Sequence, residues 1–330
     1  MGSTASLPAL TGAAVAVGAD LGGTKLLVGV VDSEQKILHR GQGPSHGRDG
    51  DEVLALLERE VTEALDAVPG AAAIGLGVPA TIDHNRGIAI NAVNLPIVNV
   101  PVAERMRERL GLPVFLDNDA NTAALAEFLY GAGKDAENMV MLTIGTGIGG
   151  GLVLGGKLYR GSTGAGAELG HVVIEIDGPR CQGTCPNRGC VETFASGTAI
   201  GREGRAAAER EPDSAIGELL ASGAEVDGKA VTEAALAGDE AARGVFTLVG
   251  SRLGVALSSF ANIFDPDVIV IGGGAMAAGD LLLDPAREEL RARALPPMNE
   301  VAVVPATMGP DAGMIGAAAM AMAELESSSA

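Results

Sequence analysis

Two carboxylates and two amides gather in five consecutive residues, where a strand is expected to give way to a helix. The segment is Asp117-Asn118-Asp119-Ala120-Asn121; an apolar run at 113–116 precedes it and an Ala- and Leu-rich run at 122–130 follows. Open α/β sheets place their chemistry at such junctions, because side chains there face a crevice and the helix N-terminus adds a partial positive charge. If the strand persists to residue 119, alternation puts Asp117 and Asp119 on one face and Asn118 on the other, so a carboxylate and an amide could both line a pocket.

The same segment also suits a helix cap. Asp and Asn are favoured at the N-cap, because their side chains accept hydrogen bonds from the first N–H groups of the helix. On these five residues alone capping is the simpler interpretation, and other parts of the chain must decide between the two.

Two predicted β-hairpins carry glycine-rich turns. In the first, strands at 13–18 and 25–31 flank Asp20-Leu21-Gly22-Gly23-Thr24, with Lys25 next; in the second, strands at 139–144 and 152–154 flank a turn that contains Gly145, Thr146 and Gly147. Backbone N–H groups in such turns can bind phosphate, and Thr24 and Lys25 can add a hydroxyl and a charge. The alternative is an ordinary hairpin tip, in which the same residues only make the turn.

The second turn also fits the spacing of a dinucleotide-binding loop, but that motif must open a helix, and the run that follows here is β-type. We therefore reject it. A third glycine run, Gly272-Gly273-Gly274, lies between an apolar strand at 268–271 and a helix-prone run. A backbone can come close to a nucleotide at such a strand-to-helix turn, although a tight turn required by packing explains the glycines equally well.

All the cysteines of the chain lie within ten residues. They are Cys181, Cys185 and Cys190, and His171 lies ten residues upstream of the first. This grouping predicts a Cys3His zinc site with a structural metal, because thiolate donors would close the shell of the ion. Free or disulfide-bonded thiols are the alternative, but three is an odd number, and the neighbouring Gly, Pro, Asn and Arg residues would not bury the cysteines as packing.

The remaining patterns alternate between strands and helices. Strands are expected at 73–78, 172–176 and 301–304, and helices at 51–68, 102–110, 201–210, 214–221, 229–237, 239–264 and 312–326. A chain of 330 residues with 47% hydrophobic residues and 48 glycines suits one large or two medium α/β domains.

Composition excludes several classes of function. The net charge of −19 would repel nucleic acid, and six Phe, two Tyr and no Trp leave little for stacking on bases or sugars, so a bound sugar would be held mainly by hydrogen bonds. The N-terminus does not resemble a signal peptide, and Gly, Asp or Glu interrupts each apolar run before the roughly 18 residues needed to cross a bilayer. We expect a soluble, cytoplasmic protein.

Together, these motifs resemble the ROK family of sugar kinases and related repressors over most of the chain. The two glycine-rich turns resemble its phosphate loops, and residues 118–121 resemble its catalytic segment; Gly166 to His171, Gly189-Cys190-x-Glu192 and Gly272 to Gly274 also match. The resemblance implies a two-lobed actin-like (ribonuclease H-like) ATPase fold, α/β, with duplicated β-hairpin and helix units. It places residues 1–117 in a small lobe, with helix 311–326 packed back on it, and residues 118–310 in a large lobe with the zinc loop 171–192.

The resemblance also implies a reaction and a set of site residues. Asp119 would accept the proton of the glucose 6-hydroxyl as it attacks the γ-phosphate of ATP, and Asp20 would hold Mg²⁺. The loops around Gly22 and Gly145 would cradle the phosphates, with the glycines at 272–274 near the nucleotide. The residues that would bind sugar hydroxyls are Asn94, Asn118, Asp119, Glu168, His171 and Glu192. His171 would contact both sugar and zinc, and the enzyme would be a homodimer or homotetramer.

Departures from the family pattern limit the assignment of the substrate. Gly183 stands where the family's metal loop has its first Cys, Pro186 replaces a Gly, and Cys181 lies two residues earlier; on the sugar side Ala80 replaces a Gly and Ile97-Val98 stand near a usual Trp. A kinase for N-acetylmannosamine, mannose or fructose, or one that uses polyphosphate, therefore stays open. A non-catalytic sugar-sensing regulator is the alternative from another class of function. Against it, the family's repressors carry an N-terminal helix-turn-helix, whereas only about a dozen residues precede the first strand here.

Overall fold

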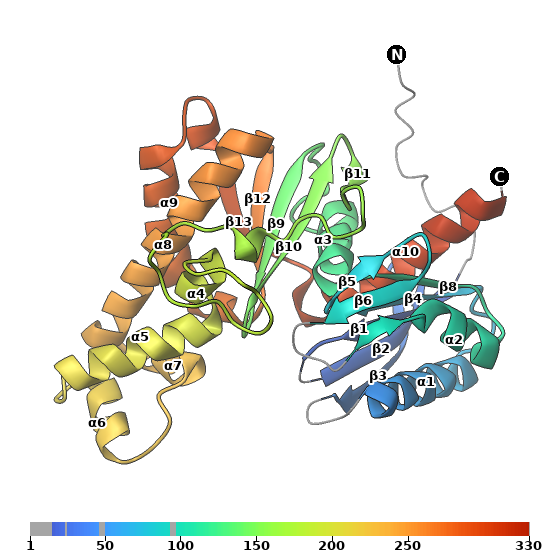
Figure 1. Ribbon diagram of the computed structural model, residues 1–330, viewed down its shortest axis with the longest axis horizontal. Helices are drawn as coiled ribbons and strands as arrows, with labels where there is room; N and C mark the ends of the chain where they lie inside the picture. The colour runs from blue at the N-terminus through green and yellow to red at the C-terminus, as the bar shows by residue number, and fades with distance from the viewer. Residues whose placement is uncertain (1–14, 24, 46–49, 93–96, 330) are drawn as a thin grey trace. The chain divides into compact units, whose positions relative to one another are not determined.

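The computed structural model describes residues 15–23, 25–45, 50–92 and 97–329 (Figure 1). The chain divides into two compact units. One comprises Met1–Asp135, Gly151–Ala167 and Thr307–Ala330, and the other comprises Ala136–Gly150 and Glu168–Ala306. These bounds differ from the predicted change of lobe at residue 117, because α3 (Asp119–Tyr130) packs against α10 (Ala312–Ser329) and so belongs to the first unit.

The first unit is built on a five-stranded sheet with the order β3-β2-β1-β4-β8. The predicted hairpin is confirmed: β1 (Val15–Leu21) pairs antiparallel with β2 (Lys25–Asp32), which pairs with β3 (Ile37–Pro44). On the other side β1 pairs parallel with β4 (Ala73–Val78), and β4 with β8 (Val114–Asn118). The carboxyl ends of β1, β4 and β8 therefore lie at one edge of the sheet.

The two faces of this sheet are covered by different kinds of helix (Figure 1). Helix α1 (Gly50–Ala67) buries the large side chains Val53, Leu57 and Val61 in the main apolar core. Helix α10 instead packs its backbone onto the sheet, since a Cβ at Gly18 would lie 2.0 Å from the carbonyl oxygen of Met314, and one at Gly75 would lie 1.8 Å from that of Ala317. These two glycines are thus required by the close approach of the helix.

A small sheet and a short helix complete the first unit. Its strands, in the order β5-β6-β7, are β5 (Ala80–Asp83), β6 (Ile88–Ala92) and β7 (Val98–Val100), and α2 (Val102–Leu110) follows. Gly111 closes α2 in the left-handed conformation with φ 73°, a common way for a helix to end.

The second five-stranded sheet repeats the plan of the first, with the order β11-β10-β9-β12-β13. Its strands are β9 (Met139–Ile144), β10 (Ile148–Leu154), β11 (Lys157–Leu158), β12 (Val268–Gly272) and β13 (Ala302–Pro305). Strand β10 pairs antiparallel with β11, whereas β12 pairs parallel with both β9 and β13. No helix follows the turn after β9, so the rejection of a dinucleotide-binding loop is confirmed.

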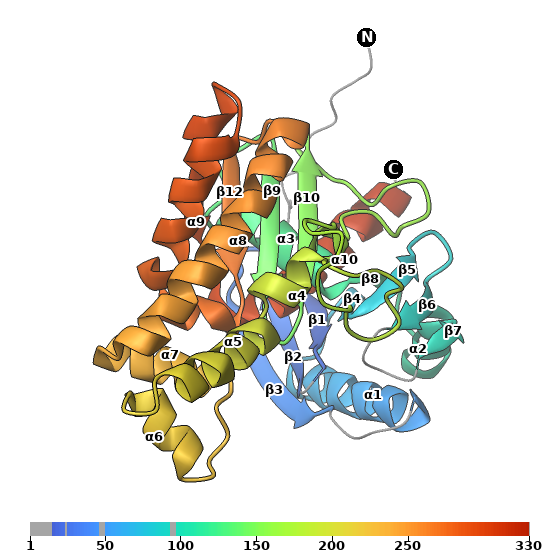
Figure 2. The same cartoon turned by 60° about the vertical axis from the view of Figure 1, so that its left-hand side comes forward.

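Helices fill most of the second unit (Figure 2). They are α4 (Val191–Ala195), α5 (Gly197–Arg210), α6 (Ala215–Ala221), α7 (Gly228–Ala237), α8 (Glu240–Phe264) and α9 (Asp280–Arg293), with short 3₁₀ turns at Leu169–His171, Gly274–Ala278 and Met298–Glu300. Another 3₁₀ turn, Gly309–Asp311, precedes α10 in the first unit. The predicted helices agree with these to within a few residues.

One helix in the described part of the chain, α8, is long and apolar enough to cross a membrane by length and composition alone. The relevant 18-residue window is 61% buried, and α8 packs against α5, α7 and α9. It is therefore accounted for as a core helix of the second unit.

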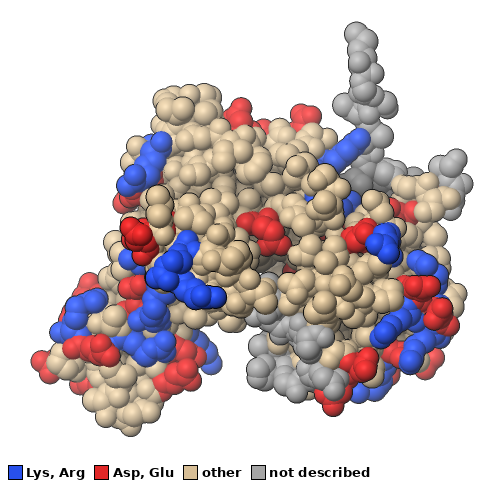
Figure 3. Space-filling view, in the orientation of Figure 1, with Lys and Arg blue, Asp and Glu red and all other residues tan. Residues whose placement is uncertain are grey.

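Two local predictions are corrected. Residues 172–176 do not form a strand: Val173 makes a single bridge to Cys190, and Val172, Val173 and Ile176 are exposed, so alternation has no apolar layer to face. Helix α3 begins at Asp119 rather than Thr122, because Asn118 caps it. On the face drawn in Figure 3, Lys and Arg side chains gather in several places, with Asp and Glu side chains among them.

Candidate active site and metal centre

The acidic junction is a capped helix start. The Asn118 side chain accepts hydrogen bonds from the backbone N–H groups of Ala120 at 2.9 Å and Asn121 at 3.3 Å. The N-cap interpretation is therefore right for Asn118, and β8 ends before residue 119, so alternation does not carry Asp119 onto the face of Asp117. Asp119 is instead the first helical residue, and its Oδ1 accepts from the N–H of Ala120 at 2.9 Å.

Asp20 and Asp119 form an acidic pair in the first unit. Asp20 lies near the end of β1 in register with Gly77 of β4, which is in turn in register with Asp117 of β8. The pKa of Asp20 is raised to about 7, first by desolvation through burial and then by the negative charge of Asp119, while Lys25 lowers it. Two neighbouring carboxylates whose negative charges repel can bind a cation, and one of them can take up or release a proton.

The first glycine turn is closed on itself. The N–H of Gly22 donates to the carbonyl of Lys25 at 2.8 Å, and Ser45 Oγ donates to the carbonyl of Gly22 at 2.7 Å. A Cβ at Gly23 would meet nothing within 4 Å, so this position is open. Thr24 and Asn94, both predicted site residues, lie outside the described residues.

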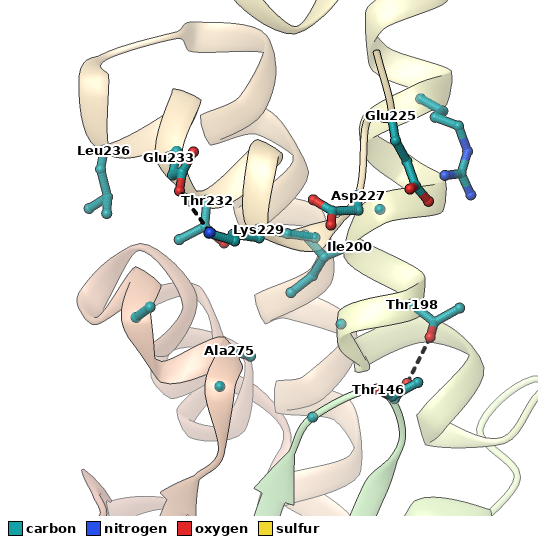
Figure 4. Close-up of a pocket in the computed structure, with 17 residues that line it drawn as sticks. Thr146, Thr198, Ile200, Glu225, Asp227, Lys229, Thr232, Glu233, Leu236 and Ala275 are labelled. Carbon is teal, nitrogen blue, oxygen red and sulfur yellow. Dashed lines mark hydrogen bonds and ion pairs between the residues drawn. The ribbon is translucent and has the colours of Figure 1, made fainter. Parts of the chain in front are cut away.

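The second unit contains a cavity of about 690 Å³, within the usual range for small-molecule sites (Figure 4). It is lined by the β9–β10 turn, by α5 and α7, and by the 3₁₀ turn that follows β12. Of the predicted nucleotide residues, it brings together Gly145, Thr146 and Gly274. Ile200, Leu236 and Ala275 supply apolar walls, and Thr198 and Thr232 supply hydroxyls.

Two helix N-termini reach this cavity. Ser196 caps α5 and Asp227 caps α7, each through a side-chain oxygen, and a glycine follows each cap. A Cβ at Gly228 would lie 2.7 Å from the carbonyl oxygen of Gly197, so the glycines allow the two helix starts to approach closely. The N-terminus of a helix carries a partial positive charge and suits a bound phosphate.

The β9–β10 turn is tied to α5. The N–H of Gly197 donates to the carbonyl of Gly145 at 2.8 Å, and Thr198 Oγ1 donates to that of Thr146 at 2.8 Å (Figure 4). Gly147, also a predicted nucleotide residue, does not line the cavity, because a Cβ there would lie 2.3 Å from Glu192 Oε2. The turn therefore presents Gly145 and Thr146 to the cavity and Gly147 to Glu192.

Gly272 and Gly273 shape the cavity without lining it. Gly272 ends β12 in the core, and Gly273 has φ 90°, with its ideal Cβ 2.4 Å from the carbonyl oxygen of Ile144. At these two positions the packing explanation holds, whereas Gly274 lines the cavity itself.

The predicted sugar residues of the second unit lie close together. His171 Nε2 is 3.9 Å from Glu168 Oε2, and the pKa of Glu168 is raised by burial first, with the His171 charge lowering it and that of Glu192 raising it. Glu192 is 7% exposed, and its Oε2 accepts from the N–H of Ile148 at 2.8 Å. Glu192 thus holds the β9–β10 turn, a contact that the sequence did not predict.

The three cysteines and His171 form the predicted cluster. Cys185 and Cys190 Sγ are 4.0 Å apart, Cys181 Sγ is 3.5 Å from His171 Nδ1, and all four ligand atoms lie within 4.8 Å of one another. Four ligands at a zinc–sulfur bond length of about 2.3 Å would be separated by roughly 3.8 Å in a tetrahedron. The donors therefore fit Zn²⁺, and Cys181 is one of them although its spacing departs from the family pattern.

The cluster is held by its loop rather than by disulfides. All three cysteines are free, and burial raises the pKa of the Cys181 and Cys190 thiols, so zinc would displace their protons on binding. Gly189 has φ 67°, and its N–H donates to the carbonyl of Pro179 at 2.8 Å. Cys181 Sγ also lies 3.8 Å from Glu192 Oε1, so one carboxylate touches both the cluster and the β9–β10 turn.

Sequence patterns alone missed the helical wall of the cavity. The missed residues include Thr198, Ile200, Arg205, Asp227, Lys229, Thr232 and Leu236. A cap followed by Gly occurs at both Ser196-Gly197 and Asp227-Gly228, and this is the pattern of an anion-binding helix start that could have indicated them.

Known proteins match this chain over most of its length. The glucokinase of Thermotoga maritima is 38% identical over 307 residues, which cover 92% of this chain and 96% of that protein. A ROK family glucokinase from Streptomyces griseus, solved in complex with glucose and AMPPNP, is 34% identical with a TM-score of 0.84 and covers 93% of this chain and 99% of that one. The xylose repressor of Caldicellulosiruptor bescii is 31% identical over 262 residues, which cover 75% of this chain and 62% of the repressor.

These matches confirm the predicted fold class, the two-lobed actin-like ATPase fold with duplicated hairpin and helix units. The repeated strand order of the two sheets is the duplication in this chain. The ROK family model itself matches residues 16–324. The chain belongs to the ROK family.

Proposed function

We propose that this chain is an ATP-dependent sugar kinase that transfers the γ-phosphoryl group of ATP to the 6-hydroxyl of glucose. The observation that carries the proposal is the position of Asp119, at the start of α3 and electrostatically coupled to Asp20. Glucokinases 36–38% identical over most of the chain support glucose as the hexose.

Asp119 is the proposed general base. Phosphoryl transfer needs a positioned hydroxyl, neutralised phosphate oxygens and a group that takes the hydroxyl proton. The Ala120 N–H and the helix start fix the Asp119 carboxylate, and Asn118 is held beside it by its own capping bonds. A fixed carboxylate can orient the hydroxyl and accept its proton as the new O–P bond forms.

The proposed ATP site is the cavity of the second unit. Its apolar walls suit a nucleoside, and the helix starts beside Gly145 and Thr146 suit phosphate oxygens. Polyphosphate has no nucleoside to fill the apolar part, so the cavity favours a nucleotide donor. The AMPPNP complex of the Streptomyces griseus relative supports the same donor class.

Asp20 is the proposed Mg²⁺ residue. Burial first and the charge of Asp119 second disfavour its ionised form, and a divalent cation would stabilise that form. When bound, Mg²⁺ would neutralise charge on the phosphate oxygens. Lys25 already opposes part of the negative potential at Asp20 from within the first unit.

The residues proposed to contact the hexose are named unit by unit. In the first unit they are Asn118 and Asp119, and in the second Glu168, His171 and Glu192. His171 Nδ1 faces the cysteine cluster, which leaves Nε2 on the side of Glu168. A zinc ion bound there would fix the ring, so the metal would order sugar contacts without entering the chemistry.

Formation of the sugar phosphate tests the proposal; it is followed by NMR with both donors and by a coupled ADP-release assay with ATP, because polyphosphate releases no ADP. The purified protein is assayed with glucose, mannose, fructose and N-acetylmannosamine, each with ATP and with polyphosphate. We expect the highest kcat/KM with glucose and ATP, and the phosphorylated product should be the 6-phosphate by NMR. Preference for another hexose or for polyphosphate would replace the corresponding part of the proposal, and sugar binding without sugar phosphate formed from either donor would favour a regulator.

The remaining predictions concern the assembly and location of the enzyme. A homodimer or homotetramer is proposed, and light scattering on the purified protein measures it directly. A cytoplasmic location is likewise proposed and is tested by cell fractionation.

A further inference from the structure

A set of four charged side chains lies directly behind the proposed catalytic segment, and the proposed mechanism does not use it. They come from four different parts of the first unit and are called here the charge network: Asp117, Arg160, His84 and Glu324. Asp117 is on β8, Arg160 follows β11, His84 follows β5, and Glu324 is on α10.

Asp117 is the centre of the charge network. It is 1% exposed, and its Oδ2 accepts from Arg160 Nε at 2.6 Å. Its Oδ1 accepts from the N–H of Asn118 at 2.7 Å and from Asn121 Nδ2 at 2.9 Å. The carboxylate thus holds a residue before Asp119 and a residue after it, while Arg160 compensates the charge that burial would otherwise disfavour.

Arg160 is itself fixed by its loop. The carbonyl of Arg160 accepts from the N–H of Gly166 at 2.9 Å, so residues 160–166 close into a ring. Gly164 has φ 83°, and a Cβ there would lie 2.0 Å from the carbonyl oxygen of Ile82 on β5. The guanidinium is therefore presented to Asp117 from a loop that packs on the β5–β6 hairpin.

His84 completes the charge network in its protonated form. Its Nδ1 lies 3.0 Å from the carbonyl oxygen of Leu116 and its Nε2 lies 3.1 Å from Glu324 Oε1. Both partners are acceptors only, so an imidazolium satisfies both contacts and a neutral ring satisfies one. The Glu324 carboxylate accordingly raises the pKa of His84, with Asp117 adding to the rise and burial and Arg160 opposing it.

The charges balance in this state. Asp117 and Glu324 are the anions facing His84, and Arg160 is the other cation, with its guanidinium 3.9 Å from Glu324. Loss of the His84 proton leaves the two carboxylates with one cation. Because Leu116 immediately precedes Asp117 on β8, the ring contacts the strand that carries the catalytic segment.

We propose that the charge network positions Asn118 and Asp119 for proton transfer, and that it does so fully only while His84 is protonated. The proposal rests on the assignment of Asp119 as the general base. The four residues are positioning residues: they act through the backbone of residue 118 and the side chain of Asn121, not by touching substrate.

Arg160→Met removes the cation that pairs with Asp117 and keeps a side chain of similar length. We expect kcat to fall by roughly 10–100-fold, as for a small misplacement of a catalytic group, while KM for ATP stays within about twofold. Arg160→Lys keeps the charge but not the Nε–H donor and should give an intermediate kcat. Arg86→Met is the matched control, because Arg86 lies in the turn of the β5–β6 hairpin, on which the Arg160 loop packs, and its side chain is 73% exposed.

A pH profile separates positioning from simple support of the fold. Under single-turnover conditions, wild-type rates should fall on the alkaline side as His84 loses its proton. Glu324→Gln removes the main cause of the raised His84 pKa, so the midpoint of this fall should move to lower pH. In His84→Gln the fall on the alkaline side should disappear, and the rate should stay at the lower level across that range.

The outcomes distinguish this inference from the proposed function. If Asp119→Asn retains full activity, the general base is wrong. If Asp119→Asn is inactive while the Arg160 and His84 variants keep wild-type rates and pH profiles, the charge network is only structural and the inference is overturned. Should Arg160→Met fail to fold, Arg160→Lys and Glu324→Gln carry the same test through the rate and the midpoint.

Discussion

The two glycine-turn hairpins occupy equivalent places in two sheets of the same strand order, yet their chemistry differs. The β1–β2 turn follows a carboxylate, Asp20, whose pKa is raised by burial and by Asp119. The β9–β10 turn is held by backbone and hydroxyl bonds from Gly197 and Thr198 beside a nucleotide-sized cavity. Under the proposed function, the duplicated backbone would support acid chemistry in one copy and phosphate binding by neutral N–H groups in the other.

Among the changes that test this difference between the two copies, removal of the Asp119 carboxylate should have the largest effect. Asp119→Asn keeps the volume and the helix start but cannot accept the hydroxyl proton. We expect kcat to fall by roughly 10²–10⁴, the usual share of a positioned base. Glucose binding, measured by calorimetry without ATP, should stay near the wild-type value.

Asp311→Asn is a suitable control for that variant, because Asp311 is a surface carboxylate of the same unit that pairs with Arg40. Its kcat should match wild type. Wild-type turnover by Asp119→Asn would show that this residue is not the general base. It would also contradict the assignment of acid chemistry to the first copy.

Removing the metal centre should have the next largest effect. Cys181→Ser replaces a thiolate donor, so zinc content by elemental analysis should fall well below one ion per chain, and kcat/KM for glucose should fall by about 10–100-fold. Thr184→Ser, an exposed change in the same loop, is the control and should keep its zinc. Full metal content in Cys181→Ser would show that this cysteine, whose spacing departs from the family pattern, is not a ligand.

The phosphate-binding copy can be tested at its closest helix contact. Gly228→Ala introduces a Cβ that would lie 2.7 Å from the carbonyl oxygen of Gly197, so one helix start must move away from the cavity. We expect KM for ATP to rise by roughly tenfold with a smaller change in KM for glucose, measured by the ADP-release assay. Gly244→Ala on α8 is the control, since a Cβ there meets nothing within 4 Å. An unchanged KM for ATP would place the nucleotide elsewhere.

Sequence patterns predicted the local elements well, because their signals are local. The β1–β2 hairpin, α2 and the cysteine cluster follow from alternation, helical spacing and donor chemistry over short stretches. The extent of the first unit was not predictable in this way, because the packing of α3 on α10 joins residues nearly two hundred positions apart. Residues 172–176 have strand-forming side chains, but the bends of the metal loop leave them without a partner strand.

Site residues were predictable from the sequence where the chemical group itself indicates the role. They were not predictable where the role depends on a contact with another residue. Asp119 and the zinc donors are recognisable as chemical groups in a motif. Arg160 and Glu192 are not, because their importance lies in a single buried contact each, to Asp117 and to the N–H of Ile148. Such contacts depend on the tertiary fold and have no sequence pattern of their own.

The smallest expected effect is the contribution of Asp20 to the stability of the folded protein. Asp20 has a pKa of about 7 in the folded protein against 3.8 for an unperturbed Asp, so the folded state holds its proton more tightly than the unfolded chain. Stability from this group is therefore highest below pH 4, falls as pH rises to 7, and stays low above it. Without Mg²⁺ or ATP, the Tm of Asp20→Asn minus that of wild type should grow by roughly 4 °C between pH 4 and pH 8. Added Mg²⁺ should raise the Tm of wild type at pH 8 and leave that of the variant unchanged, because only the carboxylate gains a partner. A Tm difference that does not depend on pH would contradict both the raised pKa of Asp20 and the placement of the cation there.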